Sequence, residues 1–361
     1  MSNQDAVFMA MALKLAEKGC YTTDPNPRVG CVLVKDEQLV AEGWHVKAGS
    51  AHAEINALNK IDNAKGTTAY VTLEPCSHQG KTAPCCDALI TAGIDRVVVA
   101  MQDPNPLVAG RGLRKMQDAG IIVECGVLQQ QAEALNKGYI KRMTTGLPFV
   151  RSKLAMSLDG RTAMASGESQ WITSPQSRSD VQRLRAESSA ILTGINTVLE
   201  DNPSLNARVG EQVTLAVRVI LDSQLKMPSN SKMLELPGQI WVLTCSDDDQ
   251  KITALEKTGY QVFQIREKDN KLDLQAVMFF LGEQQINNVL VEAGAILNGA
   301  LLSEKLVDEW ILYMAPCVLG DQGRGLFNLP DMQKMADKKQ LNMTSVRQVG
   351  TDLKLTFETA K

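Results

Sequence analysis

Histidine is scarce in this chain: three of its 361 residues are histidine, and aromatic residues make up only 4%. Long apolar runs are scarce as well, and the one near the N-terminus covers residues 6–13 between Asp5 and Lys14. A membrane-spanning helix needs about 20 apolar residues, and no signal-peptide cleavage pattern follows this run. We therefore expect an amphipathic helix there and no membrane association.

Runs of Lys or Arg are also absent. The chain carries 38 Lys and Arg against 41 Asp and Glu, which gives a net charge of −3. Proteins that bind nucleic acid neutralise phosphates with clustered basic side chains. The sequence therefore gives a nucleic-acid partner no electrostatic support.

A disulfide framework is missing too. The eight cysteines are scattered and nothing signals export. We therefore expect a protein of the reducing cytoplasm. In that compartment, neighbouring cysteine and histidine indicate a metal site more often than a disulfide.

The length predicts about two domains, at roughly 100–200 residues each. Strand-like and helix-like segments alternate through both halves, which favours an α/β architecture. Gly146 and Pro148 break this alternation between residues 144 and 150. We place the domains at 1–146 and 147–361.

The sequence of the first half predicts a hairpin around Asp36. It also predicts helices that begin at His52, after Pro84 and near 113–119. Its expected strands are 29–35, 39–44, 68–74, 96–101 and 121–126.

In the second half, Ser174 and Pro175 suit the N-cap and first residue of a helix that carries Arg185. The expected strands are one from 149 onward and those at 190–193, 218–222, 239–244, 288–292 and 309–315.

The most informative stretches are HAE, 52–54, and LEPCSHQGKTAPCC, 73–86. They hold His52, Cys76 and Cys85, which are ligand types that zinc takes. A catalytic zinc site uses three protein ligands and leaves the fourth position to water, whereas a structural site fills all four. We expect the catalytic kind. In the alternative, a closed structural site, His78 or Cys86 is the fourth ligand.

Glu54 supports the catalytic interpretation, because a structural zinc site needs no carboxylate beside the metal. Residues i and i+2 do not share a face of a regular helix, so we expect His52 at the very start of its helix. Zinc-dependent nucleobase deaminases combine His-x-Glu with Pro-Cys…Cys, and their Glu moves protons. Their two cysteines are normally two residues apart, whereas eight residues separate Cys76 from Cys85.

Longer motifs carry a resemblance to a known family. TDPNPRVGCVLV, HAE, EPCSHQGKTAPCC, DPNPLVAGRG, SLDGRTAMASGESQWIT and VEAGAILNGALL closely resemble the bifunctional deaminase/reductases of riboflavin biosynthesis, over essentially the whole chain. Two departures are mild: Ala83 stands where the family usually has proline, and Asn206 where threonine is frequent.

For the first domain, the resemblance implies a cytidine-deaminase-like, three-layer α/β fold that removes the 2-amino group of 2,5-diamino-6-ribosylamino-4(3H)-pyrimidinone 5′-phosphate. It implies zinc on His52, Cys76 and Cys85, with Glu54 as the proton shuttle. The implied substrate contacts are Asn26, His45, His78, Lys81, Asp103 and Asn105. From the residues alone, Asn26 and Asn105, each followed by proline, are better explained as turns.

For the second domain, the resemblance implies a dihydrofolate-reductase-like fold in which NADPH reduces the ribosyl group to ribityl. No Rossmann fingerprint is present, since GRG at 110–112 lacks the third glycine and lies in the first domain. A strand that ends at Glu292 and a helix that begins after Gly294 offer another phosphate cradle, because the first N–H groups of a helix are free. From the residues alone, a plain strand–turn–helix explains this segment equally well. The implied cofactor contacts are Ala155, Trp171, Thr197, Asp201, Ser223, Gly294, Ala295, Ile296, Leu297, Asn298, Gly299 and Ala300.

The implied substrate contacts of the second domain are Ser169, Arg185, Leu205, Arg208 and Glu292. Arg185 and Arg208 suit phosphate because a guanidinium pairs with it bidentately, although an Arg on a helix face is often only solvated. Lys153 is a weaker candidate that would help to open the ribose ring or to orient its hydroxyls.

The expected substrate is thus a pyrimidine ribose phosphate, the expected cofactors are zinc and NADPH, and we expect a homo-oligomer. Two other functions compete: a nucleic-acid-editing deaminase with an unrelated second domain, and a zinc-stabilised binding module without catalysis. The missing basic groove argues against the first, and Glu54 argues against the second.

Overall fold

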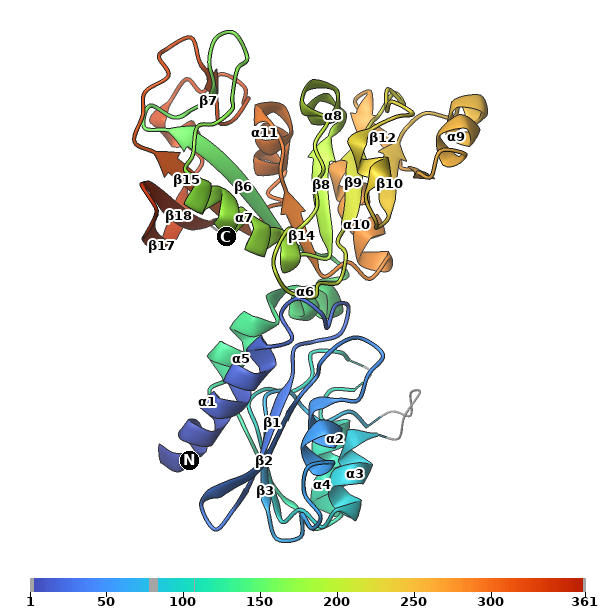
Figure 1. Ribbon diagram of the computed structural model, residues 1–361, viewed down its shortest axis with the longest axis vertical. Coiled ribbons are helices and arrows are strands. Elements are labelled where there is room, and N and C mark those ends of the chain that lie inside the picture. The colour runs from blue at the N-terminus through green and yellow to red at the C-terminus, as the bar shows by residue number, and fades with distance from the viewer. Residues whose placement is uncertain (1–2, 78–83, 107, 360–361) are drawn as a thin grey trace. The chain divides into compact units, whose positions relative to one another are not determined.

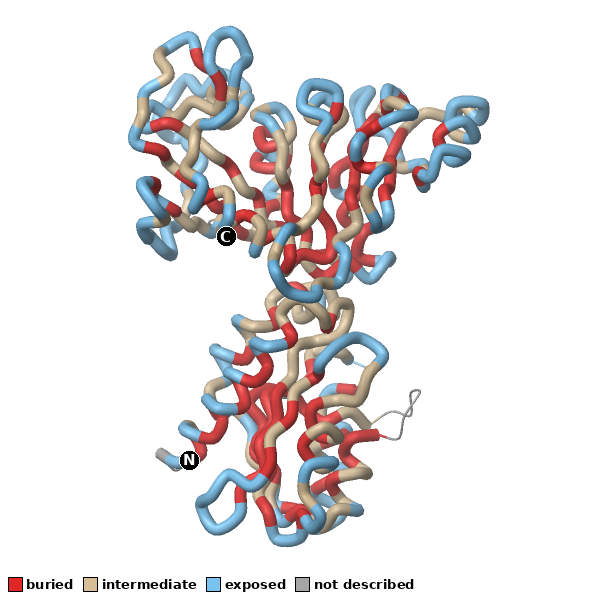
Figure 2. The backbone as a smooth tube through the Cα atoms, viewed as in Figure 1, coloured by how far each residue is buried: buried red, intermediate tan, exposed pale blue. Residues whose placement is uncertain are grey.

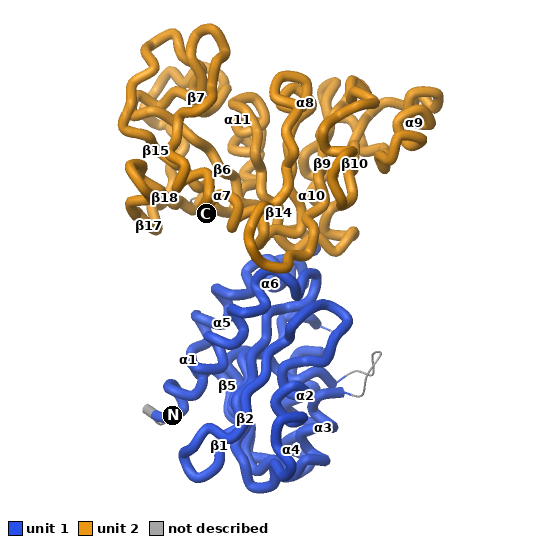
Figure 3. Tube along the Cα trace, viewed as in Figure 1, with its two compact units in different colours: residues 1–146 blue, residues 147–361 orange. Residues whose placement is uncertain are grey.

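The computed structural model describes residues 3–77, 84–106 and 108–359. The chain forms two compact units, Met1–Gly146 and Leu147–Lys361 (Figure 3). Helix α6 (Lys137–Thr145) ends at Gly146, whose backbone is left-handed with φ 74°. Glycine takes that conformation without steric cost, so the helix stops there and β6 (Phe149–Ser157) begins the second unit.

The first unit is a mixed sheet between two layers of helices (Figure 1). Its strands are β1 (Gly30–Lys35), β2 (Gln38–Trp44), β3 (Thr68–Val71), β4 (Arg96–Val99) and β5 (Ile122–Cys125). Besides α6, its helices are α1 (Asn3–Glu17), α2 (Ala53–Leu58), α3 (Cys85–Thr91), α4 (Arg111–Asp118) and α5 (Gln129–Leu135). The strand order is β2-β1-β3-β4-β5; β1 is antiparallel to both of its neighbours, and β3, β4 and β5 are parallel.

Strand β1 shows why the sheet needs a helix layer on each face. Cys31 and Leu33 pack with α2, α3 and α4, whereas Val32 and Val34 pack with α1 and α5. Successive side chains of a strand point to opposite faces, so a strand buried on both faces is apolar throughout. The buried centre of the unit follows this sheet (Figure 2).

The N-terminal segment forms the expected helix, α1, but the helix is only weakly amphipathic, because apolar Val7 and Met11 are exposed. Phe8, Met9 and Ala12 are buried against the sheet, while Val7 is 56% exposed. Among the described residues, no helix has both the length and the apolar character that crossing a membrane requires.

The expected hairpin around Asp36 is present. Asp36 and Glu37 both have positive φ, 48° and 63°, and they form a two-residue loop because Lys35 pairs with Gln38. Positive φ at both loop residues matches the twist of the two strands.

The second unit is built on a larger sheet. Besides β6, the strands of the unit are β7 (Arg161–Ala163), β8 (Ala190–Gly194), β9 (Val217–Leu221), β10 (Ile240–Thr244), β11 (Gln261–Gln264), β12 (Glu267–Lys268), β13 (Lys271–Leu272), β14 (Asn288–Val291), β15 (Glu309–Ala315), β16 (Arg324–Gly325), β17 (Leu341–Val349) and β18 (Asp352–Thr359). Of these, β12 with β13 and β16 with β7 form two separate two-stranded sheets. Its helices are α7 (Pro175–Ala186), α8 (Ile195–Asp201), α9 (Asp249–Glu256), α10 (Leu274–Glu283) and α11 (Ala295–Ser303), with 3-10 turns at Lys232–Glu235 and Met335–Asp337.

The order of the large sheet is β11-β10-β9-β8-β14-β6-β15-β18-β17. Neighbouring strands are parallel from β11 to β15, and β18 and β17 add an antiparallel edge. The chain starts at β6, runs outward from β8 to β11, and returns to insert β14 between β8 and β6. In parallel sheets, ligands bind beyond the carboxyl ends of the strands at such a reversal of order.

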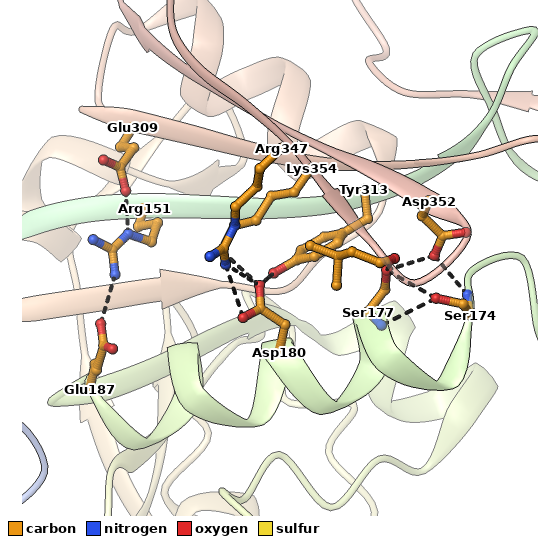
Figure 4. Close-up of polar contacts among 11 residues, drawn as sticks. Arg151, Ser174, Ser177, Asp180, Glu187, Glu309, Tyr313, Arg347, Asp352 and Lys354 are labelled. Carbon is orange, nitrogen blue, oxygen red and sulfur yellow. Dashed lines mark hydrogen bonds and ion pairs between the residues drawn. The ribbon is translucent and has the colours of Figure 1, made fainter.

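Helix α7 is held on this sheet by polar contacts (Figure 4). As expected, Ser174 is its N-cap and Pro175 its first residue. Asp180 accepts hydrogen bonds from the Tyr313 hydroxyl at 2.6 Å and from Lys354 Nζ at 2.8 Å. Burial alone would raise the pKa of Asp180, but the bonds from Lys354 and Tyr313 outweigh burial and lower it. The β17–β18 hairpin that supplies Lys354 is not among the strands that the sequence predicts.

Candidate active sites

Three ligand-type side chains meet in the first unit. His52 Nδ1 lies 3.2 Å from the Cys85 sulfur and 3.6 Å from the Cys76 sulfur, and the three ligand atoms lie within 4.8 Å of one another. A tetrahedral zinc ion with bonds of about 2.0 Å to nitrogen and about 2.3 Å to sulfur holds two such atoms about 3.5 Å apart. The donor set and its spacing therefore fit zinc.

Local backbone structure places two of these ligands at helix starts. His52 is the N-cap of α2, with extended backbone at φ −73° and ψ 168°, and Cys85 is the first residue of α3. The Cys76 sulfur accepts a hydrogen bond from the Cys85 backbone N–H at 3.3 Å. His52 thus precedes the regular helix as expected, and Glu54 interacts with both His52 and Cys85.

The alternative of a closed zinc site involved Cys86 or His78. Among the described residues, the metal-ligand group consists of the three side chains above, and Cys86 is instead fully buried in the apolar core between the sheet and α2–α4. His78 and the expected substrate contact Lys81 lie outside the described residues.

The side chains of Cys76 and Cys85 are joined by a hydrogen bond that shifts their pKa values in opposite directions. The pKa of Cys76 is lowered to about 4, first because the Cys85 thiol donates a hydrogen bond to it; burial opposes this, and His52 adds to the lowering. The pKa of Cys85 is raised, first by that same hydrogen bond and then by burial. A metal ion displaces such a proton when it binds, because its cysteine ligands are thiolates.

Glu54 lies beside this group. Glu54 is only 3% exposed, and its Oε2 has no hydrogen-bond partner among the described residues. Burial raises the pKa of Glu54 to about 7. A buried carboxylate oxygen without a partner is costly unless a ligand or water pairs with it. A carboxyl group with a pKa near neutrality can both accept and donate a proton.

His45 and Asn26 extend the site. His45 Nδ1 lies 3.1 Å from the Ala51 carbonyl oxygen, and its Nε2 lies 3.1 Å from Asn26 Nδ2. A carbonyl only accepts, so Nδ1 carries the proton and Nε2 accepts from the Asn26 amide. Burial lowers the pKa of His45, which keeps the ring neutral, and the ring meets that of His52 edge-on at 5.3 Å.

Asp103 and Asn105 lie in the loop between β4 and α4. Asp103 Oδ1 accepts hydrogen bonds from the Asn105 backbone N–H at 2.9 Å and from the Tyr139 hydroxyl at 3.2 Å. The loop is also bound by Glu74, which the sequence analysis did not single out. The available signal was a carboxylate two residues before a metal ligand, in LEPC.

In the second unit, expected contacts gather at the carboxyl ends of the parallel strands. Ala155 lies near the end of β6, Thr197 follows β8, Ser223 follows β9 and Glu292 follows β14. The Glu292 backbone N–H donates to the carbonyl oxygen of Leu192 in β8, so the ends of β14 and β8 adjoin. These positions coincide with the reversal of strand order described above.

Arg185 and Glu292 form a bidentate ion pair at this edge. Arg185 Nε lies 2.6 Å from Glu292 Oε1, and its Nη2 lies 2.9 Å from Oε2. Arg185 Nη1 also donates to the Asn206 carbonyl oxygen at 3.1 Å. Burial opposes the charge on each side chain, but the pairing outweighs it: the pKa of Arg185 is raised and that of Glu292 is lowered.

The expected phosphate cradle lies at the start of α11. Gly294 is its N-cap, and a Cβ on Gly294 would meet nothing within 4 Å, so the approach is open. Ile296 is 59% exposed, but Asn298 is fully buried. The Asn298 side chain donates to the carbonyl oxygens of Ala293 and Gly294, at 2.7 and 3.2 Å, and accepts from the Ser152 hydroxyl at 2.6 Å.

The remaining expected contacts differ in exposure. Trp171 is 70% exposed with Arg178 stacked on its ring at 4.5 Å, and Leu205 is buried. Ser169, Leu297 and Ala300 are half-buried, Asp201 and Arg208 are exposed, and Ala295 and Gly299 pack beside the loop at Asn328. Burial lowers the pKa of Lys153, a strand residue of β6, and Glu292 opposes this.

Known proteins match both units. Residues 148–355 match the model of the RibD C-terminal domain, and residues 2–101 match that of the cytidine and deoxycytidylate deaminase zinc-binding region. The riboflavin biosynthesis protein RibD of Escherichia coli K12 is 51% identical over 363 residues, which cover 97% of this chain and 98% of that protein. This chain belongs to the RibD family. RibD of Haemophilus influenzae is also 51% identical, with 99% and 98% covered.

Solved structures agree with this membership. Acinetobacter baumannii RibD has a TM-score of 0.93 at 45% identity, with 99% of each chain covered. A Thermotoga maritima diaminohydroxyphosphoribosylaminopyrimidine deaminase/5-amino-6-(5-phosphoribosylamino)uracil reductase has a TM-score of 0.87 at 32% identity, again with 99% of each chain covered. The chain is therefore a bifunctional riboflavin-biosynthesis enzyme, and the expected fold class, a cytidine-deaminase-like unit followed by a dihydrofolate-reductase-like unit, is confirmed.

Proposed function

We propose that the first unit removes the 2-amino group of 2,5-diamino-6-ribosylamino-4(3H)-pyrimidinone 5′-phosphate. The second unit then reduces the ribosyl group of the product with NADPH and gives 5-amino-6-(5-phosphoribitylamino)uracil. The unpartnered Glu54 oxygen beside three zinc-type ligands is the observation that carries the first step. The activities in the name of the Thermotoga maritima relative support the choice of substrates.

For deamination, we assign the zinc ligands to His52, Cys76 and Cys85. Zinc held there supplies a water molecule of lowered pKa as the nucleophile. Glu54 would take a proton from the water as the water oxygen bonds to C2, and would pass a proton to the 2-amino group, so that the C2–N bond breaks and ammonia leaves. Asn26 has a second amide N–H and a carbonyl oxygen with which to orient the pyrimidine ring.

For reduction, NADPH supplies the hydride. The first N–H groups of α11, after Gly294, suit a cofactor phosphate, because the N-terminal end of a helix attracts anions. Arg185 uses three of its five donors on Glu292 and Asn206 and keeps two for the substrate phosphate. Arg208 is exposed and has a guanidinium donor on the Asn206 side chain, so it can turn its other donors to the same phosphate.

The first test separates metal binding from catalysis. Glu54→Gln keeps the size of the side chain but cannot move protons, so ammonia release should fall at least about a hundredfold while zinc stays at about one per chain. Glu17→Gln, on the exposed end of α1, is the matched control and should release ammonia normally. Near-normal deamination by a zinc-loaded Glu54→Gln protein would refute the role of Glu54.

The second test asks whether the activities are separable. Glu54→Gln should still oxidise NADPH on chemically supplied deaminated substrate. Arg208→Ala should lose about 1.5–3 kcal/mol of transition-state stabilisation in the reduction, as for a hydrogen bond to a charged group, and keep deamination. If folded Glu54→Gln loses NADPH oxidation, the division of labour between the two units is wrong.

We also propose where the protein acts in the cell and that it forms a homo-oligomer. All eight cysteines lie among the described residues and none forms a disulfide, which supports action in the reducing cytoplasm.

The long edge strand β17 pairs with β18 alone among the described residues and is largely exposed. This supports a homo-oligomer, because proteins rarely leave such an edge uncovered. Light scattering on the purified protein tests this: the mass of one chain would contradict it.

A further inference from the structure

The buried carboxylate of Glu74 takes no part in the chemistry proposed above, yet it accepts hydrogen bonds from four backbone N–H groups: two in the loop between β4 and α4 and two in the first turn of α4. Glu74 is 3% exposed. Its Oε2 accepts from Asp103 at 3.2 Å and from Gly110 at 2.9 Å. Its Oε1 accepts from Gly112 at 2.9 Å and from Leu113 at 3.4 Å. The loop between β4 and α4 is therefore anchored at both of its ends.

Helix α4 depends on this carboxylate for its N-terminal cap. Its own N-cap residue is Gly110, in a left-handed conformation and without a side chain to accept hydrogen bonds. Gly112 and Leu113 are in the first turn, where backbone N–H groups have no partner within the helix. Glu74 satisfies them from another segment, and its negative charge faces the positive end of the helix.

The start of α4 also touches the segment that leads to the metal ligand Cys76. A Cβ on Gly112 would lie 2.3 Å from the Pro75 carbonyl oxygen and 3.2 Å from Glu74 Oε1. Only glycine permits this approach, which accounts for the GRG sequence that is not a dinucleotide fingerprint. Glu74 thus joins the loop of Asp103 to the segment that leads to Cys76, of which it is itself a part.

We propose that Glu74 is a positioning residue for deamination. It fixes the loop that carries Asp103 and Asn105 relative to the zinc-ligand segment, so that the bound pyrimidine lies within reach of Glu54. This inference rests on the proposed deaminase function and on the substrate-contact role of that loop. Because each carboxylate oxygen accepts from two N–H groups, Glu74→Gln places an amide N–H₂ against two donors. It therefore releases either both loop contacts, at Asp103 and Gly110, or the first turn of α4.

Kinetics on the full chain test the proposal. For the diaminopyrimidinone phosphate, kcat/KM of Glu74→Gln should fall about 10²-fold, mainly through KM, since a small misplacement of binding groups has an effect of this size. Zinc should stay at about one per chain, and NADPH oxidation on deaminated substrate should not change. A folded, zinc-loaded Glu74→Gln protein with the KM of the wild type overturns the proposal.

Asp5→Asn is the matched control for stability. Asp5 is another buried carboxylate of this unit, 2% exposed, and it bonds to Tyr70 and Arg96 away from the loop. This variant should unfold at a lower urea concentration but keep its KM; a KM raised as much as in Glu74→Gln would overturn the positioning role. Glu74→Asp, whose carboxylate reaches one methylene less far, is measured in parallel. If Glu74→Gln does not accumulate as folded protein, the KM of Glu74→Asp is compared with that of the wild type instead.

Amide hydrogen exchange separates this inference from the proposed function, because it needs no substrate. The four N–H groups that bond to Glu74 should be protected in the wild type. In folded Glu74→Gln, one pair of them should lose protection, either Asp103 with Gly110 or Gly112 with Leu113. Unchanged exchange would overturn the anchoring role. If the wild type releases no ammonia from the diaminopyrimidinone phosphate, the proposed substrate fails while the exchange result still decides the role of Glu74.

Discussion

Replacing Asn298 by alanine tests whether the α11 cradle is built by that side chain or whether the side chain instead meets the cofactor. The Asn298 amide is fully buried and makes three hydrogen bonds, to Ala293, Gly294 and Ser152. At about 1 kcal/mol for each bond, Asn298→Ala should lower the free energy of unfolding of the second unit by about 3 kcal/mol. A unit of this size loses about 2–4 °C in Tm per kcal/mol, so its transition should fall by about 6–12 °C.

Calorimetry of the cofactor-free full chain measures this effect, and the transition of the first unit serves as an internal reference. Asn196→Ala, an exposed asparagine in α8, is the matched control and should shift the transition by no more than about 2 °C. The reasoning is refuted if Asn298→Ala leaves the Tm of the cofactor-free protein unchanged but weakens NADPH binding. That result would mean that the side chain serves the cofactor directly.

Three further predictions concern other parts of the chain. Cys85→Ser should lose most of the bound zinc and Cys86→Ser should keep about one per chain, as measured by metal analysis; the reverse would make Cys86 the ligand. Gly30→Ala should lower the free energy of unfolding of the first unit by at least about 1–3 kcal/mol in urea, because the new Cβ would lie 2.0 Å from the Ala12 carbonyl oxygen; an unchanged value would mean that α1 moves away freely. Asp180→Asn should destabilise the second unit at about pH 7, and this difference should shrink toward about pH 3. The sign follows from the lowered pKa of Asp180 in the folded protein: its ionised form adds stability above the ordinary carboxyl pKa of about 3.9, and that stability is lost as the pH falls through the lower, folded value. Equal differences at both pH values in urea unfolding would contradict it.

Much of the first site is predictable because its signals are local. His52 and Glu54 are two residues apart, and a helix start is the place where such neighbours can serve one site, as the extended backbone of His52 shows. The Ser174–Pro175 cap and the turn at Asp36 follow from preferences that act within a few residues. Buried strands such as β8 and β10 are short apolar runs and are predicted to within a residue or two.

Features that depend on residues far away in the chain could not be predicted from the sequence. The β17 sequence, LNMTSVRQV, has no apolar run and is a strand because it pairs with β18 over its whole length. Asn298 belongs to a phosphate-cradle motif, yet the fold turns its side chain inward to Ser152, which is 146 residues away in sequence. Nothing in the pattern LEPC reveals that Glu74 caps a helix 38 residues later.

The sequence by itself therefore determined which residue types are available for zinc and proton transfer, where most of the buried strands lie, and where the chain divides near Gly146. Only the tertiary structure decided which side chains face one another: that Cys76, Cys85 and His52 converge while Cys86 joins the core, and that β14 enters between β8 and β6. The physical reason is that periodicity, caps and turns are set by interactions within a few residues. The partners of a buried polar group are set instead by strand order and helix packing, which arise from contacts between residues far apart in the chain.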